Sequence, residues 1–319
     1  MKKITIIIAI LMLSLLLLTA CNVGKKKTST TGFVGGSDGI NAEITIESIS
    51  GGNRVFDAGV DPFKIDITLQ NEGEFNVEEG KVLITLDGIS FVAFSITQPT
   101  KLNALPLLGL RKEATGVTEA SQTIVQYDAN YKPDEDADRL VNLAANFCYE
   151  YETISRVTDL CLKKRVTGPS SDTACKIDEE KLVENSGAPF KVTTVSERPA
   201  GEQKVNVFLA AENVGQGTLY RPAFLSKGEC VSNDEDKNKM YVKVELLDYL
   251  EQSSSIVSCS GLEGNKGEVT VIQDKIQLSC GIDTSSLTQE SAFETPLRVT
   301  FSYVYKDAVS TTLTLKSSI

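Results

Sequence analysis

The chain has 319 residues, of which 41% are hydrophobic and 24% charged, and 32 basic against 43 acidic residues give a formal net charge of −11. This composition is typical of a folded globular protein, and the length predicts about two domains. The acidic balance argues against nucleic acid as a partner, because binding to phosphates requires positive charge. The sequence contains no histidine, which excludes Ser-His-Asp and Cys-His nucleophile systems and His-ligated zinc.

A secretory leader is predicted at the amino terminus. Lys2 and Lys3 precede an apolar run from Ile4 to Leu18, and small residues follow it; this is the three-part pattern of a signal peptide. The run is shorter than the roughly 20 residues that a membrane-spanning helix requires. Residues 1–20 are therefore interpreted as a signal peptide that is removed.

The end of the leader carries a second, more specific pattern. Leu18-Thr19-Ala20-Cys21 resembles the lipobox of prokaryotic lipoproteins. The resemblance implies that a diacylglyceryl group is attached to the thiol of Cys21 and that cleavage occurs just before it. Two acyl chains suffice for stable anchoring, so we expect a protein that is lipid-anchored to the cell membrane and faces outside the cytoplasm. In the alternative interpretation the apolar run stays as the membrane anchor and Cys21 is incidental.

Two polar segments predict how the remaining chain is divided. Residues 21–39 are rich in Gly, Ser, Thr and Lys, and such a flexible tether reaches roughly 20–25 Å. Residues 166–188 are polar and contain Gly, Pro and Ser, which indicates a linker. We therefore expect one module at 40–165 and another at 189–319.

The two expected modules share a strand pattern. In residues 63–71 apolar and polar residues alternate up to Asn71-Glu72-Gly73, and residues 205–213 repeat this up to Asn213-Val214-Gly215. Period-two alternation with β-branched and aromatic residues is typical of half-buried strands. The Asn and Gly residues are interpreted as supplying turn conformations between strands.

A second match is an F-x-Y-x-Y strand, found at 147–151 and again at 301–305. A closing strand is expected after each copy, around Leu160 in the first module and around Leu313 in the second. These repeats predict an all-β fold of two tandem immunoglobulin-like β-sandwich domains after the leader. A strand ending in N-x-G, followed by the V-x-I-x-L-D-G pattern of residues 82–88, resembles CARDB-like and related immunoglobulin-like modules of prokaryotic surface proteins. The resemblance implies adhesion or spacing and carries over no catalytic residue.

Six cysteines remain besides Cys21, and an even number in an exported chain argues for disulfides. Cys148 and Cys161 are both expected to point away from the core on adjacent antiparallel strands, which predicts that they pair. The remaining cysteines are assigned as Cys259 with Cys280 and, by elimination, Cys175 with Cys230.

No motif predicts a catalytic residue, a metal or a cofactor, so we expect a protein that is not an enzyme. The acidic runs at 134–138 and 234–236 could offer oxygen ligands to calcium, but they lack the EF-hand pattern and are interpreted as solvated loops. Paired carboxylates for glycoside hydrolysis remain open, because their pairing is spatial.

The expected function is therefore that of a non-enzymatic cell-surface lipoprotein with an adhesion, spacer or protein-docking role in the cell envelope. Its partners would be the membrane, through the lipid, and another envelope or surface protein. One alternative is a lipid-anchored solute-binding protein or a carboxylate-based hydrolase with its site between the modules. Another is a subunit of an export or pilus assembly that binds through an exposed strand edge.

Overall fold

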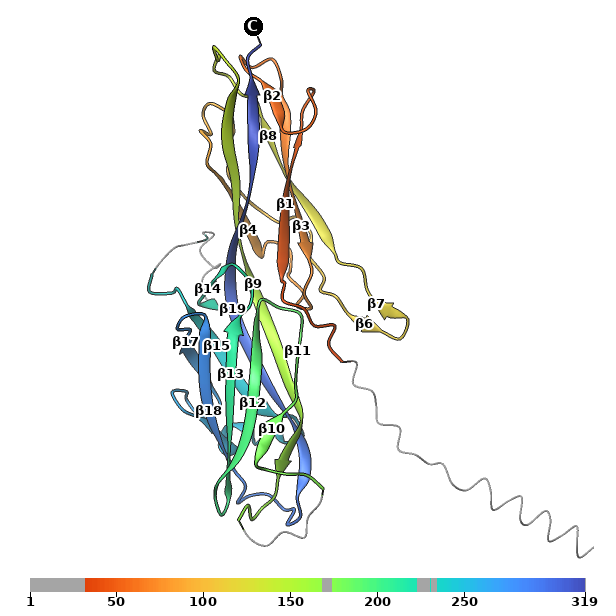
Figure 1. The fold of residues 1–319 in the computed structure, drawn as a ribbon, viewed down its shortest axis with the longest axis vertical. Coiled ribbons are helices and arrows are strands. Elements are labelled where there is room, and N and C mark those ends of the chain that lie inside the picture. Colours follow the sequence, from red (N-terminus) through yellow and green to blue (C-terminus); the bar gives the residue numbers. More distant parts are fainter. Residues whose placement is uncertain (1–31, 168–173, 223–229, 231–233, 319) are drawn as a thin grey trace, which may run out of the picture. The chain divides into compact units, whose positions relative to one another are not determined.

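The computed structural model describes residues 32–167, 174–222, 230 and 234–318 (Figure 1). Contacts divide the chain into two units, Met1–Gly32 and Phe33–Ile319. All of the strands described below belong to the second unit.

This unit is built almost entirely from antiparallel strands, so the all-β sandwich prediction is confirmed. One sheet has the strand order β1-β3-β8 and consists of β1 (Ile40–Glu47), β3 (Phe63–Asn71) and β8 (Gln122–Ala129). A five-stranded sheet has the order β10-β12-β13-β18-β16 and consists of β10 (Glu179–Lys181), β12 (Phe190–Gly201), β13 (Lys204–Asn213), β18 (Lys275–Asp283) and β16 (Val257–Cys259).

A third sheet has nine strands, and six of them form its main path, β17-β15-β19-β9-β4-β5. These six are β17 (Lys266–Thr270), β15 (Lys239–Leu246), β19 (Phe293–Lys316), β9 (Arg139–Leu162), β4 (Val82–Asp87) and β5 (Thr100–Leu102). The other three are β11 (Val183–Asn185) beside β9, and β14 (Thr218–Tyr220) and β2 (Arg54–Phe56) beside β19. A separate two-stranded hairpin is formed by β6 (Lys112–Glu113) and β7 (Gly116–Val117), and Leu247–Tyr249 and Ser253–Ile256 form short helical turns.

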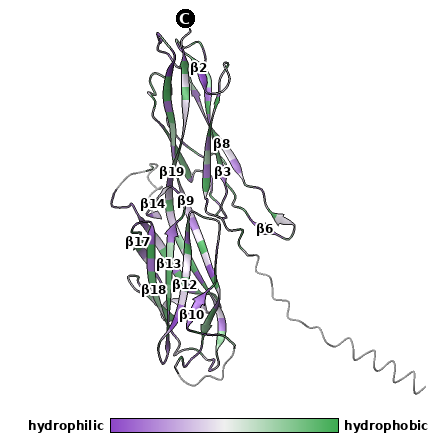
Figure 2. Cartoon of the chain, in the orientation of Figure 1, coloured by the Kyte–Doolittle hydropathy of each residue, from purple (hydrophilic) through white to green (hydrophobic). Residues whose placement is uncertain are grey.

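Alternating side chains explain why these segments form strands. Along β3 the side chains of Ile65, Ile67 and Leu69 are fully buried, and β3 pairs with β1 on one side and β8 on the other. Hydrophobic and hydrophilic residues are mixed along single strands in Figure 2. One face of each sheet is therefore apolar and packs against another sheet.

The nine-stranded sheet contributes to two sandwiches. Tyr127 of β8 donates a hydrogen bond to the carbonyl oxygen of Ile84 of β4 at 3.2 Å, which joins the β1-β3-β8 sheet to it. Phe190 of β12 contacts Phe301 of β19 edge to face, with ring centroids 5.1 Å apart, which joins the five-stranded sheet to it. Two sandwiches thus share one continuous sheet.

The shared sheet is organised around β9 and β19, which have 24 residues each and pair along almost their full length. The first half of β9 pairs with β4, whereas its second half pairs with β11. Likewise, the first half of β19 pairs with β15 and its last residues pair with β2. Each strand therefore begins in the sandwich of its own half of the chain and ends in the other sandwich.

The passage of β9 and β19 from one sandwich to the other is called strand exchange below. It corrects the expectation of a turn before each closing strand. Leu160 lies on the same strand as Tyr151, and Leu313 lies on the same strand as Tyr305. The physical reason is visible in the intervening residues 152–159 and 306–312, which contain neither Gly nor Pro and several β-branched residues. Such segments favour extended backbone over a tight turn.

The exchange also changes the expected domain boundaries. Residues 33–319 form one compact unit, so modules at 40–165 and 189–319 are not separate units. The expected linker at 166–188 contains β10 and β11, which pair with β12 and β9. Its polar side chains are compatible with edge strands, which composition does not distinguish from a linker.

The last part of the expected tether is also held by the body. Val34 and Gly35 donate backbone hydrogen bonds to the two carboxylate oxygens of Glu74, each at 2.9 Å. The Phe33 ring lies 5.4 Å from the guanidinium of Arg156. Residues 21–31 of the tether lie outside the described residues.

Candidate functional site

The described cysteines form three disulfides, Cys148–Cys230, Cys161–Cys175 and Cys259–Cys280. Cys259 and Cys280 lie directly opposite each other on β16 and β18, and this predicted pairing is confirmed. The other two predicted pairings, Cys148 with Cys161 and Cys175 with Cys230, are wrong.

Strand geometry explains why the predicted pairing of Cys148 with Cys161 is wrong. Cys148 and Cys161 lie on the same strand, β9, where an extended chain separates them by about 40 Å. Their pairing required the turn that β9 does not make. Cys161 instead binds Cys175 in the segment that follows the strand.

Cys148 faces away from the main core, as alternation predicts, yet it is only 1% exposed. It forms a small second apolar cluster with Leu83, Tyr220 and Val304, and Cys230 packs against this cluster. The Cys148–Cys230 disulfide therefore covers one face of the shared sheet and links the two halves of the chain.

Cys21, the predicted lipidation site, lies outside the described residues, as does the apolar run before it. Among residues that the structure describes, no helix has the length and apolar character needed to cross a membrane.

The acidic run at 134–138 contacts Asp57 and the end of β19. Within the described residues no group of three or more potential ligands is arranged to bind a metal. Asp138 instead pairs with Lys316 at the end of β19. The carboxylate of Asp57 accepts backbone hydrogen bonds from Ser318 at 2.8 Å and Glu135 at 2.7 Å.

These contacts shift the titration of both carboxyl groups. The hydrogen bond from Lys316 lowers the pKa of Asp138, and hydrogen bonds from Ser318 and Glu135 lower the pKa of Asp57. Both groups are thus held as carboxylates that clamp the carboxyl-terminal end of the exchanged strand β19.

A repeated unit of Asn, Gly and Tyr lies where the halves meet. The hydroxyl of Tyr305 donates to Oδ1 of Asn213 at 3.1 Å and accepts from the backbone amide of Gly217 at 2.8 Å. A Cβ atom on Gly215 would overlap the Tyr305 hydroxyl. A Cβ atom on Gly73 would likewise overlap the Tyr151 hydroxyl. The glycine of N-x-G is therefore required by the close approach of a tyrosine hydroxyl, a constraint that its interpretation as a turn residue missed.

A cavity of about 450 Å³ lies beside this unit. Both halves of the chain line it. Residues 37–42, 147 and 149 belong to the first half, and residues 189, 214–216, 305 and 307–309 belong to the second. Its polar lining includes Asp38, Asn41, Gln216 and Asp307. The volume is within the range of small-molecule sites.

Two tyrosines at this cavity are not available as bases. Burial raises the pKa of Tyr149 well above its ordinary value and that of Tyr305 to about 12. The backbone amide of Ile40 donates to the Tyr149 hydroxyl at 3.1 Å. Both hydroxyls stay protonated at neutral pH, so they can donate and accept hydrogen bonds but cannot attack a substrate as phenolates.

The most strongly perturbed carboxyl group lies elsewhere. Glu197 of β12 is fully buried, and burial raises its pKa to about 8. One carboxyl oxygen accepts from the backbone amide of Cys161 at 3.0 Å and lies 3.3 Å from Nζ of Lys181. The other oxygen, Oε1, has no partner among the described residues. The sequence pattern does not mark Glu197 or Lys181, because it does not show, without the fold, whether a charged residue on a strand is buried in the core.

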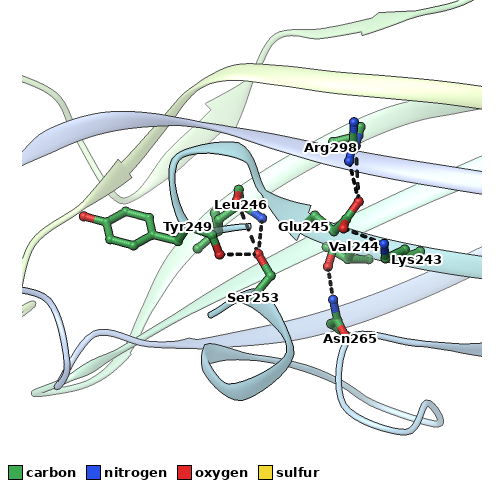
Figure 3. Close-up of polar contacts among 8 residues, drawn as sticks. All are labelled: Lys243, Val244, Glu245, Leu246, Tyr249, Ser253, Asn265 and Arg298. Carbon is green, nitrogen blue, oxygen red and sulfur yellow. Dashed lines mark hydrogen bonds and ion pairs between the residues drawn. The ribbon is translucent and has the colours of Figure 1, made fainter. Parts of the chain in front are cut away.

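The contacts in Figure 3 have structural roles. Glu245 lies between Lys243 and Arg298, with its carboxylate oxygens 2.6 Å and 2.7 Å from their nitrogen atoms. Ser253 accepts from the backbone amide of Leu246 at 3.0 Å and donates to the carbonyl oxygen of Tyr249 at 2.9 Å. Ser253 also lies 3.3 Å from the carbonyl oxygen of Leu246. All three Ser253 contacts are to the backbone, which fixes the loop after β15 and provides no activating base.

Comparisons with known proteins identify no family. No protein-family model matches the chain, and no curated protein matches it. A serine-rich repeat protein (Srr2) from Streptococcus agalactiae aligns with 10% identity over 88% of this chain and 94% of its own, with a TM-score of 0.15. The yeast delta-COP-I mu-homology domain, solved with a Dsl1 WxWxV peptide, aligns with 10% identity over 83% and 74%, with a TM-score of 0.13. At these TM-scores neither likeness carries an argument about fold or function.

Proposed function

We propose that this chain is a non-catalytic envelope lipoprotein that is anchored through Cys21 and presents its β-sandwich body for docking to another protein outside the cytoplasmic membrane. The observation that carries the proposal is the set of three disulfides in the body. Structural disulfides persist in oxidising compartments and are rare in the cytosol. They support the same export that the leader and its lipobox-like end predict.

The docking role is supported by a free strand edge. Among the described residues, β8 pairs only with β3, so its outer side is open to another strand. Ile124 of β8 is 55% exposed. Nζ of Lys101 donates a hydrogen bond to one carbonyl oxygen of β8, that of Gln126, at 2.6 Å. An extended segment of an envelope protein could add to this edge through backbone hydrogen bonds.

Metabolic labelling with a fatty acid tests the anchor. Wild-type protein should be labelled, and Cys21→Ala should lose the label and the membrane association. Cys175→Ser is the matched control, since it also removes one cysteine but should keep the label. Absence of label on the wild type would overturn the anchor.

Site-specific photo-crosslinking tests the docking edge. A photoreactive residue at Ile124 should give a discrete adduct with one envelope protein. The control position is Ile49, which is 81% exposed but lies outside the described strands. Equal adducts from both positions, or none from Ile124, would contradict docking at β8.

The cavity between the halves favours a second candidate function, binding of a small polar solute. Asp38, Asn41, Gln216 and Asp307 offer it hydrogen-bonding groups from both halves. Native mass spectrometry of the purified chain with a panel of amino acids and short peptides tests this candidate. It predicts a bound species that Asp307→Asn weakens.

A further inference from the structure

The outer face of the five-stranded sheet carries a hollow of about 460 Å³ that no function discussed above uses. It is bordered by Thr194 and Ser196 of β12, Phe208 and Ala210 of β13, and Gln277 and Ser279 of β18. We propose that this face binds neutral glycans, with the Phe208 ring as the stacking platform.

Strand register places the six side chains in two rows. Ser196 and Ser279 lie directly opposite Phe208 on its two sides. Thr194 and Gln277 lie in the same way on either side of Ala210. Directly opposed residues have Cβ atoms about 4.5–5.5 Å apart, so an aromatic ring is flanked by hydroxyls, with a small residue beside it.

The chemistry of this surface matches a sugar ring. Phe208 is 41% exposed, and an exposed aromatic face packs against the apolar C–H face of a pyranose. Hydroxyl and amide groups can both donate and accept, as sugar hydroxyls do. The side chains of Thr194, Ser196 and Gln277 make no hydrogen bond to another residue in the part of the chain described, which leaves them available for a ligand.

The lack of charge in the two rows favours neutral over acidic glycans. The two rows contain no charged side chain. In the row beyond Ala210, Glu212 pairs with Lys275 at 3.4 Å, and in the row beyond Phe208, Arg198 lies opposite Asn206. A carboxylate placed over the two rows would lose water without meeting a cation there, because Arg198 lies outside them, in the row beyond Phe208. A neutral saccharide has no such cost.

The site extends toward a second hollow. A depression of about 600 Å³ shares Ser260, Gln277 and Leu278 with the first. The Cys259–Cys280 disulfide holds Ser260 at this border, where its backbone amide donates to the carbonyl oxygen of Ser279 at 2.8 Å. The combined length favours an oligosaccharide over a monosaccharide.

Calorimetric titration of the purified full chain tests the site, using neutral trisaccharides of glucose, galactose, mannose and N-acetylglucosamine, their monosaccharides, and sialyllactose. At least one neutral trisaccharide should bind more tightly than its monosaccharide and than sialyllactose. Phe208→Ala should weaken that binding about tenfold, and Gln277→Ala should weaken it several-fold.

Phe56→Ala is the matched control, because Phe56 is a similarly exposed phenylalanine, 37% accessible, on β2. It should bind as wild type does, and thermal unfolding should show that all three variants are folded. Failure of every neutral trisaccharide to bind, preference for sialyllactose, or unchanged binding by folded Phe208→Ala would overturn the proposal. The lipid-labelling result is independent of this titration, so failure here leaves the anchor proposal intact.

Discussion

The hydroxyl of Tyr151 on β9 donates a hydrogen bond to Oδ1 of Asn71 at the end of β3, at 3.2 Å. Asn71 also donates from Nδ2 to the carbonyl oxygens of Phe75 at 2.7 Å and Leu107 at 3.0 Å. The Tyr305–Asn213 contact repeats this relationship in the second half at 3.1 Å. The two motifs that the sequence repeats, N-x-G and F-x-Y-x-Y, are therefore the two sides of one hydrogen-bonded unit.

Asn71→Ala should destabilise the protein by about 2–4 kcal/mol, because it removes several hydrogen bonds and leaves buried partners unsatisfied. Asn213→Ala should cost less, since Asn213 is only partly buried. Urea unfolding of both variants checks the order. An equal or reversed order would show that burial does not control the strength of this unit.

Strand exchange predicts the behaviour of half of the chain. Tyr149 lies opposite Tyr305 and Tyr151 opposite Tyr303, with ring centroids 5.9 and 6.4 Å apart. Since each half supplies the same F-x-Y-x-Y strand, two copies of β9 can pair in the same register. A fragment of residues 33–165 should therefore form a symmetric dimer in analytical ultracentrifugation. A folded monomeric fragment would show that β9 can turn back on its own sandwich.

The disulfides should differ in their effect on stability. In the chain-entropy treatment, removing Cys148–Cys230, with a sequence separation of 82, costs about 4.5 kcal/mol. Removing Cys161–Cys175, with a separation of 14, costs about 3 kcal/mol. Denaturant unfolding of the two double Cys→Ser variants checks the order.

Peptide mapping of the unreduced protein checks the connectivity itself. Trypsin cleavage at Arg156 separates Cys148 from Cys161, so each should appear in a different disulfide-linked peptide. A peptide joining Cys148 to Cys161 would contradict the fold, because it requires β9 to break.

The buried carboxyl of Glu197 should make stability fall with rising pH. Its pKa is raised from 4.5 to about 8 in the folded state, so the folded protein holds a proton that the unfolded chain releases. The resulting stabilisation is complete below about pH 4.5 and is lost as pH rises toward 8. Glu197→Gln should have a flatter stability profile between pH 5 and 8 in urea unfolding.

Asp283→Asn is the control for this profile. Hydrogen bonds from Ser285 lower the pKa of Asp283, so this group stays ionised from pH 5 to 8 and its removal should not change the slope. The clamp carboxylates Asp57 and Asp138 also have lowered pKa values. Their stabilisation is present above about pH 4 and lost only as pH falls through their folded-state values. A wild-type profile that is flat from pH 5 to 8 would contradict the protonation of Glu197.

Several elements could be predicted from the residue pattern, because the residues that determine them are close together in the sequence. The alternation of Phe63, Ile65, Ile67 and Leu69 with polar residues predicted β3, and the same pattern predicted β13. The Cys259–Cys280 pair was also accessible, since its cysteines lie on strands close in sequence. The cavity between the halves and Glu197 had no such signal, because each depends on residues brought together by the fold.

The sequence by itself determined that this protein is built from strands, that its halves repeat one pattern, and that its cysteines favour disulfides. Only the tertiary structure decided that β9 and β19 cross from one sandwich to the other and that Cys148 pairs with Cys230. The physical reason is that side-chain alternation controls which face of a strand is buried. It carries no information on which strand, near or distant in sequence, completes the hydrogen bonds at that strand's edge.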